Sequence, residues 1–205
     1  MYRVAKRTLD IVGSAVFLLL ALPLMATLYL AVRLRMGSPV FFRHKRPGWN
    51  EQPFGCLKFR TMTEGRDANG ELLPDEERLT PLGIFLRRYS LDELPQFWNV
   101  LKGEMSLVGP RPLEMRYLPR NSSEQRRRHL VKPGITGWAQ INGRNTLSWE
   151  QKFALDVWYV DHCSLWLDLK ILFVTAWKVL TAEGVSHSGH ATMPAFMGTQ
   201  TTTEY

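Results

Sequence analysis

Two adjacent carboxylates, Asp92 and Glu93, are the residues whose types and spacing best fit chemistry. They lie in the segment Ser90-Leu-Asp-Glu-Leu-Pro-Gln, and Gly109-Pro-Arg-Pro follows within about twenty residues as a rigid turn that presents a cation. Adjacent carboxylates can divide the work, because one can attack as a nucleophile or hold Mg²⁺ while its neighbour handles a proton or orients the incoming group. The pattern therefore indicates acid, metal and phosphate chemistry at one place.

Phosphate chemistry also needs fixed positive charge, and arginine suits bidentate contact with phosphate. The candidate cations are Lys58, Arg60, Arg87, Arg88, Arg111 and Arg144. Most single arginines on a protein surface are only solvated, so charge alone does not select among them.

The acidic pair also has a purely structural interpretation. Ser90 and Glu93 have the spacing of a capping box, with Ser90 before the helix and Glu93 at its third position. Pro95 counts against this, because a proline at the fifth position of a helix loses a hydrogen bond and collides with the preceding turn. The pattern alone leaves both interpretations open.

The element that precedes this chemistry is an uncharged, mainly apolar stretch of about 22 residues, Ile11 to Val32, long enough for a helix to cross a membrane. It exceeds the apolar region of a signal peptide, and the residues from Arg33 onward do not resemble a cleavage site. Basic residues flank both ends, which draws both toward the cytosol. Pro23 favours a kink near the middle. A re-entrant helix and an ordinary spanning helix both fit these features.

The whole chain has 205 residues and is 45% hydrophobic, so the part outside the membrane stretch can bury a sizeable core. The expected division is a membrane helix over 1–36, a catalytic domain over 37–183 and an extended tail over 184–205. The expected fold is mainly α with short β-strands, an α+β domain.

Short strands are predicted from Val40 into Arg43–Arg46 and over Phe54–Met62, with a polar loop containing about one helical turn over Thr63–Thr80. Helices are predicted over Pro81–Tyr89, Leu94–Leu101, Ser122–Val131, Ser148–Tyr159 and Leu167–Leu180. Tryptophans crowd the second half of the chain, which favours amphipathic helices at the membrane interface.

The net charge of +7 favours anionic partners, but nucleic acid, acidic lipid and phosphorylated substrates all satisfy it. A membrane-tethered nucleic-acid binder would leave Asp92 and Glu93 without a role, and no known binding module is evident. A membrane-anchored Mg²⁺ phosphohydrolase acting on a lipid diphosphate is the closer alternative. Cys56 and Cys163 lack the spacing of a zinc site or a disulfide framework.

Three long segments carry a resemblance to a known family. They are Lys58-Phe-Arg-Thr-Met, the run from Ser90-Leu-Asp-Glu-Leu-Pro-Gln through Gly109-Pro-Arg-Pro, and Lys132-Pro-Gly-Ile-Thr-Gly-Trp-Ala-Gln-Ile-Asn-Gly-Arg-Asn. They closely resemble the monotopic phosphoglycosyl transferases among the bacterial sugar transferases. The resemblance covers nearly the whole chain and is closest to the minimal, single-domain PglC-type members, which open protein glycosylation pathways.

The resemblance implies a ping-pong reaction between a UDP-sugar and undecaprenyl phosphate. Asp92 would attack the sugar-bearing phosphate, release UMP and keep the phosphosugar until undecaprenyl phosphate attacks it. Glu93 would deprotonate or position the lipid phosphate, Mg²⁺ would sit at Asp92, and Arg111 would bind phosphate. Further substrate-binding positions implied by the resemblance are Lys58, Arg87, Arg144 and Asp168.

The same resemblance implies a re-entrant helix in a single leaflet of the bacterial inner membrane, among phospholipids, with the catalytic domain on the cytoplasmic face. Lys6, Arg7 and Asp10 reproduce the start of the family's helix, whereas Leu22-Pro23 stands where the family has a Ser-Pro pair. The first donor to try is UDP-N,N′-diacetylbacillosamine, followed by UDP-N-acetylgalactosamine or UDP-N-acetylglucosamine. The sequence does not indicate an oligomeric state.

Overall fold

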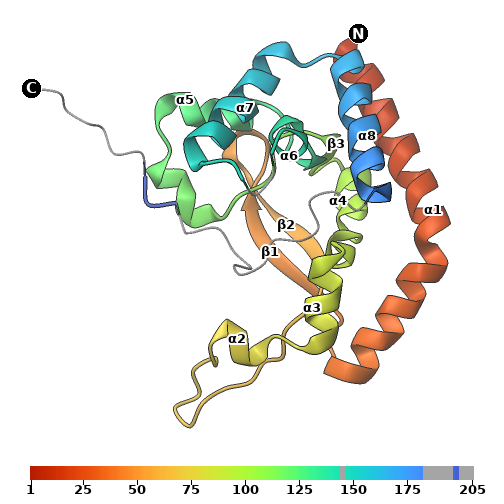
Figure 1. Cartoon of the computed structure of the whole chain (residues 1–205), viewed down its shortest axis with the longest axis vertical. Coiled ribbons are helices and arrows are strands. Elements are labelled where there is room, and N and C mark those ends of the chain that lie inside the picture. The colour runs from red at the N-terminus through yellow and green to blue at the C-terminus, as the bar shows by residue number, and fades with distance from the viewer. Residues whose placement is uncertain (144–145, 182–195, 199–205) are drawn as a thin grey trace, which may run out of the picture.

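The computed structural model describes residues 1–143, 146–181 and 196–198. Figure 1 shows a mostly helical chain in which the long helix α1 (Tyr2–Met36) runs along one side of a body formed by the remaining elements. The other α-helices are α2 (Asp75–Arg78), α3 (Pro81–Arg88), α4 (Gln96–Lys102), α5 (Ser123–Arg126), α6 (Trp138–Ile141), α7 (Trp149–His162) and α8 (Leu165–Leu180).

Two small sheets lie within the body. Strand β1 (Phe41–Pro47) pairs antiparallel with β2 (Pro53–Phe59), and both strands lie in segments where the sequence predicted short strands. Strands β3 (Ser106–Val108) and β4 (Gly134–Thr136) form a short parallel pair that sequence reasoning missed. Three residues are too few to display the alternation by which a strand is recognised.

The predicted helices agree with the structure except in the segment 122–131. There the chain forms α5 and then a separate 3₁₀ turn, η4 (Arg127–Leu130). Helices α7 and α8 begin after Ser148 and Ser164, whose hydroxyls each accept a backbone N–H of the first turn. Such caps supply partners for backbone groups that a helix start leaves unpaired.

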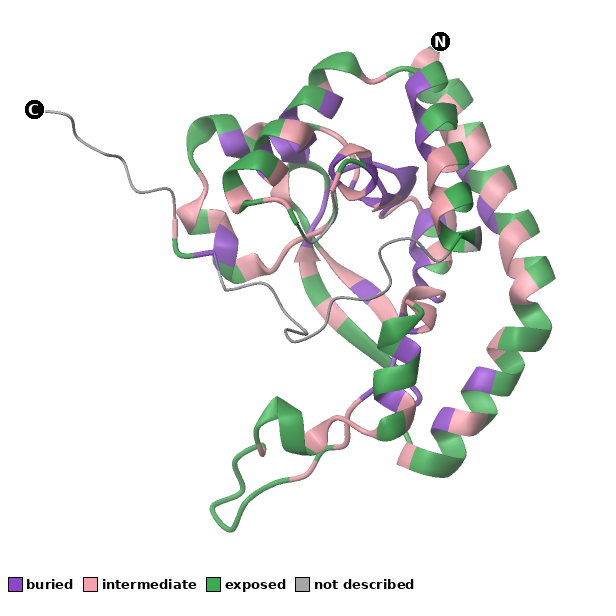
Figure 2. Ribbon diagram, viewed as in Figure 1, coloured by how far each residue is buried: buried purple, intermediate pink, exposed green. Residues whose placement is uncertain are grey.

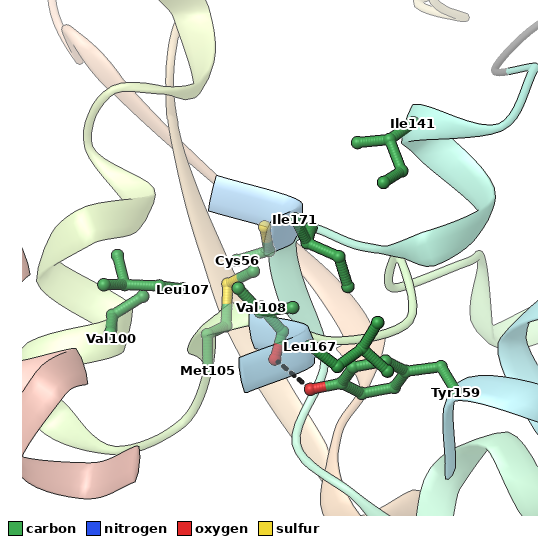
Figure 3. Close-up of a cluster of buried hydrophobic side chains, with 9 residues drawn as sticks. All are labelled: Cys56, Val100, Met105, Leu107, Val108, Ile141, Tyr159, Leu167 and Ile171. Carbon is green, nitrogen blue, oxygen red and sulfur yellow. Dashed lines mark hydrogen bonds between the residues drawn. The ribbon is translucent and has the colours of Figure 1, made fainter. Parts of the chain in front are cut away.

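The main core lies where the two sheets meet α4, α7 and α8. Figure 3 shows its buried side chains, with the Tyr159 hydroxyl donating to the Val108 carbonyl at 3.3 Å. The cluster comprises Cys56, Val100, Met105, Leu107, Val108, Ile141, Tyr159, Leu167 and Ile171. This core joins the strands that carry the candidate site to the last described helix.

Helix α1 contacts the body near both of its ends. Near its start, the buried Asp10 accepts the Ser106 hydroxyl at 2.9 Å and the Leu107 N–H at 2.8 Å. Near its end, Leu28 and Val32 are buried in a second apolar cluster, which includes Leu86 of α3. Both ends of the helix are therefore fastened to the same body.

Most of the apolar surface between these contacts is open. Figure 2 shows α1 largely exposed, and Leu19, Leu20 and Leu22 are all more than half exposed. Among the described residues, α1 is the helix long and apolar enough to cross a membrane. It continues through Leu22 and Pro23 on a curved course in Figure 1, and the re-entrant kink expected there stays a prediction.

The tail expected over 184–205 falls outside the described residues except for 196–198. Within that short piece, Phe196 is buried in an aromatic cluster with Tyr117 and Phe153. The body therefore provides a specific contact for at least one residue of the tail.

Candidate active site

Asp92 and Glu93 lie on a single 3₁₀ turn, η2 (Leu91–Glu93), between α3 and α4. Ser90 before it has φ 55°, a left-handed conformation, and its side chain makes no cap hydrogen bond. Helix α4 begins only after Pro95. The capping-box interpretation is therefore wrong, because Ser90 is left-handed and its side chain makes no cap hydrogen bond to the turn that follows.

The side chain of Lys58, from β2, joins the two carboxylates. Its ammonium lies 2.6 Å from Glu93 Oε1 and 3.5 Å from Asp92 Oδ2. The Asp92 side chain is 9% exposed and that of Glu93 is 15% exposed. A cation thus stands between two largely buried acids, and the acidic pair has the charge partner that its burial requires.

Arg111 approaches Glu93 from the turn that follows β3. Its guanidinium donates to Oε1 at 2.6 Å and to Oε2 at 3.3 Å, a bidentate contact, while the side chain is 49% exposed. Gly109 allows the turn to lie against β4, because a Cβ there would come within 2.3 Å of the Lys132 carbonyl oxygen. The half-exposed guanidinium can reach a phosphate while it remains on Glu93.

Asn99 fixes β2 relative to the acidic turn. Its amide oxygen accepts the Leu57 N–H at 2.9 Å, and its amide nitrogen donates to the Gly55 carbonyl at 2.8 Å. Asn99 lies on α4, the helix that follows the acidic turn, and is 2% exposed. It therefore sets the position of Lys58 against the carboxylates.

The two acids differ in their electrostatics. Burial raises the pKa of Asp92, and the nearby Lys58 charge only partly offsets this. Burial also acts to raise the pKa of Glu93, but the charges of Arg111 and Lys58 outweigh it and lower that pKa to about 2. Glu93 is thus held ionised, whereas the ionised form of Asp92 is the less stabilised of the two carboxylates.

The other predicted phosphate-binding residues differ in the contacts that they make. Arg87 donates to the Thr61 hydroxyl at 3.0 Å, and its charge acts to lower the pKa of Asp92. Arg60 instead bonds the main-chain oxygens of Met36 and Ser38, so it secures the end of α1. Arg144 lies outside the described residues.

Asp168 is not brought to the acidic pair. Its side chain is fully buried and bonded to Lys6 at 2.8 Å, to the Tyr159 hydroxyl at 2.6 Å and to the Tyr2 hydroxyl at 3.0 Å. These contacts fill a junction between α1, α7 and α8. The carboxylate therefore has structural partners at this junction, and its expected contact with substrate stays a prediction.

Sequence reasoning missed two residues of β1. His44 and Arg46 share a face of the hairpin with Lys58, since Phe42 pairs with Lys58 and side chains alternate along a strand. Arg46 lies 3.2 Å from His44 Nδ1, and burial lowers the pKa of both side chains. The available signal was the basic run Arg43–Arg46 within a predicted strand, because strand alternation places His44 and Arg46 on one face.

The donor set for a metal is small. Among the described residues no group of three or more His, Cys, Asp or Glu side chains is placed to hold a metal ion. Mg²⁺, however, is commonly bound through one or two carboxylates, with substrate phosphates and waters completing its shell. The buried Asp92 beside Glu93 fits that chemistry.

The chain is similar to known proteins along most of its length. The family model described as bacterial sugar transferase matches residues 1–182. An uncharacterized sugar transferase, EpsL, of Bacillus subtilis is 57% identical over 95% of this chain and 96% of that protein.

Two longer relatives have more specific names. The UDP-glucose:undecaprenyl-phosphate glucose-1-phosphate transferase of Escherichia coli is 44% identical over 86% of this chain but 40% of its own length. The undecaprenyl-phosphate galactose phosphotransferase of Salmonella typhimurium is 41% identical over 89% of this chain and 42% of its own length. The chain thus spans less than half of each of these two relatives.

Proposed function

This chain belongs to the bacterial sugar transferase family and is a phosphoglycosyl transferase, and from that premise we propose that it transfers a phosphosugar from a UDP-sugar to undecaprenyl phosphate. The products are undecaprenyl-diphosphate-sugar and UMP. The observation that carries the proposal is the buried Asp92 of raised pKa beside a Glu93 held by Lys58 and Arg111. The printed names of the relatives support the two substrates.

In the first half-reaction, an Asp92 carboxylate oxygen attacks the sugar-bearing phosphorus of the donor. The bond from that phosphorus to the bridging oxygen breaks, and UMP leaves with the electron pair. Lys58 and Arg111 lie where they can stabilise the negative charge that gathers on the phosphate oxygens. In the second half-reaction, an oxygen of undecaprenyl phosphate attacks the same phosphorus and releases Asp92.

Glu93 acts in this scheme as a positioning group. A carboxylate with a pKa of about 2 is a weak base near neutral pH, so it is poorly suited to remove a proton. A phosphate monoester has a second pKa of about 6, so the lipid phosphate needs no strong base at pH 7. Of the two roles that family resemblance implied for Glu93, positioning of the lipid phosphate fits the geometry better, through the basic side chains that Glu93 holds.

Mg²⁺ completes the proposal as a cofactor held by Asp92. When bound, it supplies positive charge to phosphate oxygens and orients them. Its donor set would be the Asp92 carboxylate together with the phosphates of the donor and water.

We further propose that α1 is re-entrant and enters a single leaflet of the bacterial inner membrane from the cytoplasmic face. Two contacts support this, because Asp10 and Val32, near opposite ends of the apolar stretch, both pack on the charged body. A helix spanning the membrane would draw part of that body into lipid, where unpaired charges are costly. The exposed Trp166, Phe173 and Trp177 on α8 suit the same interface with phospholipids.

The donor in this proposal is a UDP-sugar of the kinds that the resemblance and the relatives' names suggest. The names of the relatives add UDP-glucose and a galactose donor to the acetamido sugars that family resemblance suggested. The reaction would open the assembly of a membrane glycoconjugate, with protein glycosylation as one destination.

Mass spectrometry of the protein with each UDP-sugar, Mg²⁺ and no lipid acceptor tests the mechanism. We expect a phosphosugar adduct on Asp92 with release of UMP, and no adduct in Asp92→Asn. The control is Asp67→Asn, a loop carboxylate. Inorganic phosphate released from a lipid diphosphate, without UMP from any donor, would favour the phosphohydrolase instead.

A further inference from the structure

A buried ion pair between Arg128 and Asp156 lies next to the active-site turn, which is the segment Gly109–Pro112 that carries Arg111. Arg128 is 2% exposed, and its Nε and Nη2 donate to Asp156 Oδ2 at 3.0 Å and 2.6 Å. Asp156, on α7, is 4% exposed. Burying two charges is costly unless further bonds use their remaining donors, so the other contacts of Arg128 are informative.

One of those contacts reaches the active-site turn. Arg128 Nη2 donates to the main-chain oxygen of Arg111 at 2.7 Å. Pro110 and Pro112 flank Arg111 and have no N–H to anchor the turn. On the side nearer β3, the Gly134 N–H bonds the Pro110 carbonyl at 3.0 Å. Arg128 therefore holds the residue from which the side chain of Arg111 extends to Glu93.

Aromatic rings cover the buried pair. The guanidinium of Arg128 lies 5.5 Å from the ring centre of Phe153, and Phe196 packs edge-on against Phe153 at 5.0 Å. Phe196 is itself 2% exposed, and its carbonyl accepts from Arg120. The rings keep water from the pair, which strengthens its hydrogen bonds.

We propose that Arg128 is a positioning residue that acts through Arg111 and sets the strength of donor-phosphate binding. The inference rests on the proposed function. Arg128 supplies one fork to two acceptors, the Asp156 carboxylate and the Arg111 carbonyl. A displacement of this carbonyl moves the Arg111 guanidinium away from the phosphates, and misplacement by about 1 Å can cost as much as a hundredfold in rate.

The test replaces the whole pair, since a single substitution would leave one buried charge unpaired. Arg128→Met with Asp156→Leu removes both charges at similar volume, a change that often preserves stability. Arg127→Met with Asp161→Leu is the matched control, because that pair also joins η4 to α7 but is partly exposed. Thermal unfolding establishes that both double variants are folded.

Steady-state UMP release then gives the donor KM and kcat. We expect the Arg128/Asp156 variant to raise the donor KM about tenfold, the loss typical of a misplaced charge-assisted contact. In an Arg111→Gln background the same change should alter KM less than about twofold, because residues that act through one another are not additive. Arg128→Lys keeps the charge but loses the forked guanidinium, so its donor KM should lie between those of the wild type and the Arg128/Asp156 variant.

The inference would be overturned if the Arg128/Asp156 change raised the donor KM equally in the wild-type and Arg111→Gln backgrounds. It would also be overturned if the folded Arg128/Asp156 variant had the same donor KM as the control variant. Either result would leave the proposed function intact. A wild-type protein that releases no UMP from any UDP-sugar would instead overturn the proposed function, and the inference with it.

Discussion

The ammonium of Lys6 lies 2.8 Å from the carboxylate of Asp168, although 162 residues separate them in the sequence. This contact ties the start of α1 to α8, the last described helix. The Asp168 side chain has no exposed surface, so a substrate phosphate could reach it only if the junction opened. We therefore assign Asp168 to the anchoring of α1.

Asp168→Asn should destabilise the protein without weakening the binding of the donor. The variant leaves Lys6 without a charge partner at a buried site, which typically costs about 3–5 kcal/mol. Thermal unfolding in detergent measures the loss, and UMP release by the folded fraction gives the donor KM. Asp161→Asn, which removes a partly exposed ion pair, is the control. A tenfold higher KM with unchanged stability would restore a substrate-binding role to Asp168.

Lys58→Gln should shift the acid side of the pH–activity profile to higher pH. The Lys58 charge acts to lower the pKa of Asp92, so its removal lets burial raise that pKa further. Since only ionised Asp92 can attack, half-maximal kcat/KM would then occur at a higher pH. Lys45→Gln, an exposed substitution on the same hairpin, should leave the profile in place. An unmoved profile in Lys58→Gln would argue against Asp92 as the titrating group.

Glu93→Gln should destabilise the protein near neutral pH but much less in acid. The folded-state pKa of Glu93 is lowered from 4.5 to about 2, so its ionised form stabilises the fold above about pH 4.5. That contribution, at most about 3 kcal/mol at neutral pH, is lost as the pH falls through 2. Urea unfolding at pH 7 and pH 3 measures the difference, with the exposed Glu64→Gln as control. If the loss of stability in Glu93→Gln were as large at pH 3 as at pH 7, it would contradict a lowered pKa of Glu93 in the folded protein.

Cysteine labelling should find both ends of α1 on the cytoplasmic face. Arg3→Cys and Arg35→Cys place exposed thiols at the two ends, in a background with Cys56 and Cys163 replaced. An impermeant maleimide should label both in inverted inner-membrane vesicles and neither in right-side-out vesicles. Asn69→Cys, in an exposed loop of the body, marks the cytoplasmic side. Labelling of the two ends from opposite faces would establish a spanning helix.

Local composition was enough to predict several elements. The apolar run in α1, the two strands β1 and β2, and the four longer body helices follow from hydrophobic patterning. Asp92, Glu93 and Arg111 were also identified from residue type and spacing. These features depend on residues close together in the chain, so the sequence displays them directly.

The sequence by itself determined which chemical groups this protein carries and which segments are apolar enough for lipid. Only the tertiary structure decided their partners: Lys58 and Arg111 meet on Glu93, while Asp168 pairs with Lys6. It also decided that Ser90 turns the chain and does not cap a helix. The physical reason is that the position of a charged residue in the sequence does not indicate which oppositely charged residue it will meet. Ion pairs form wherever packing of the core brings opposite charges together in a poorly solvated place.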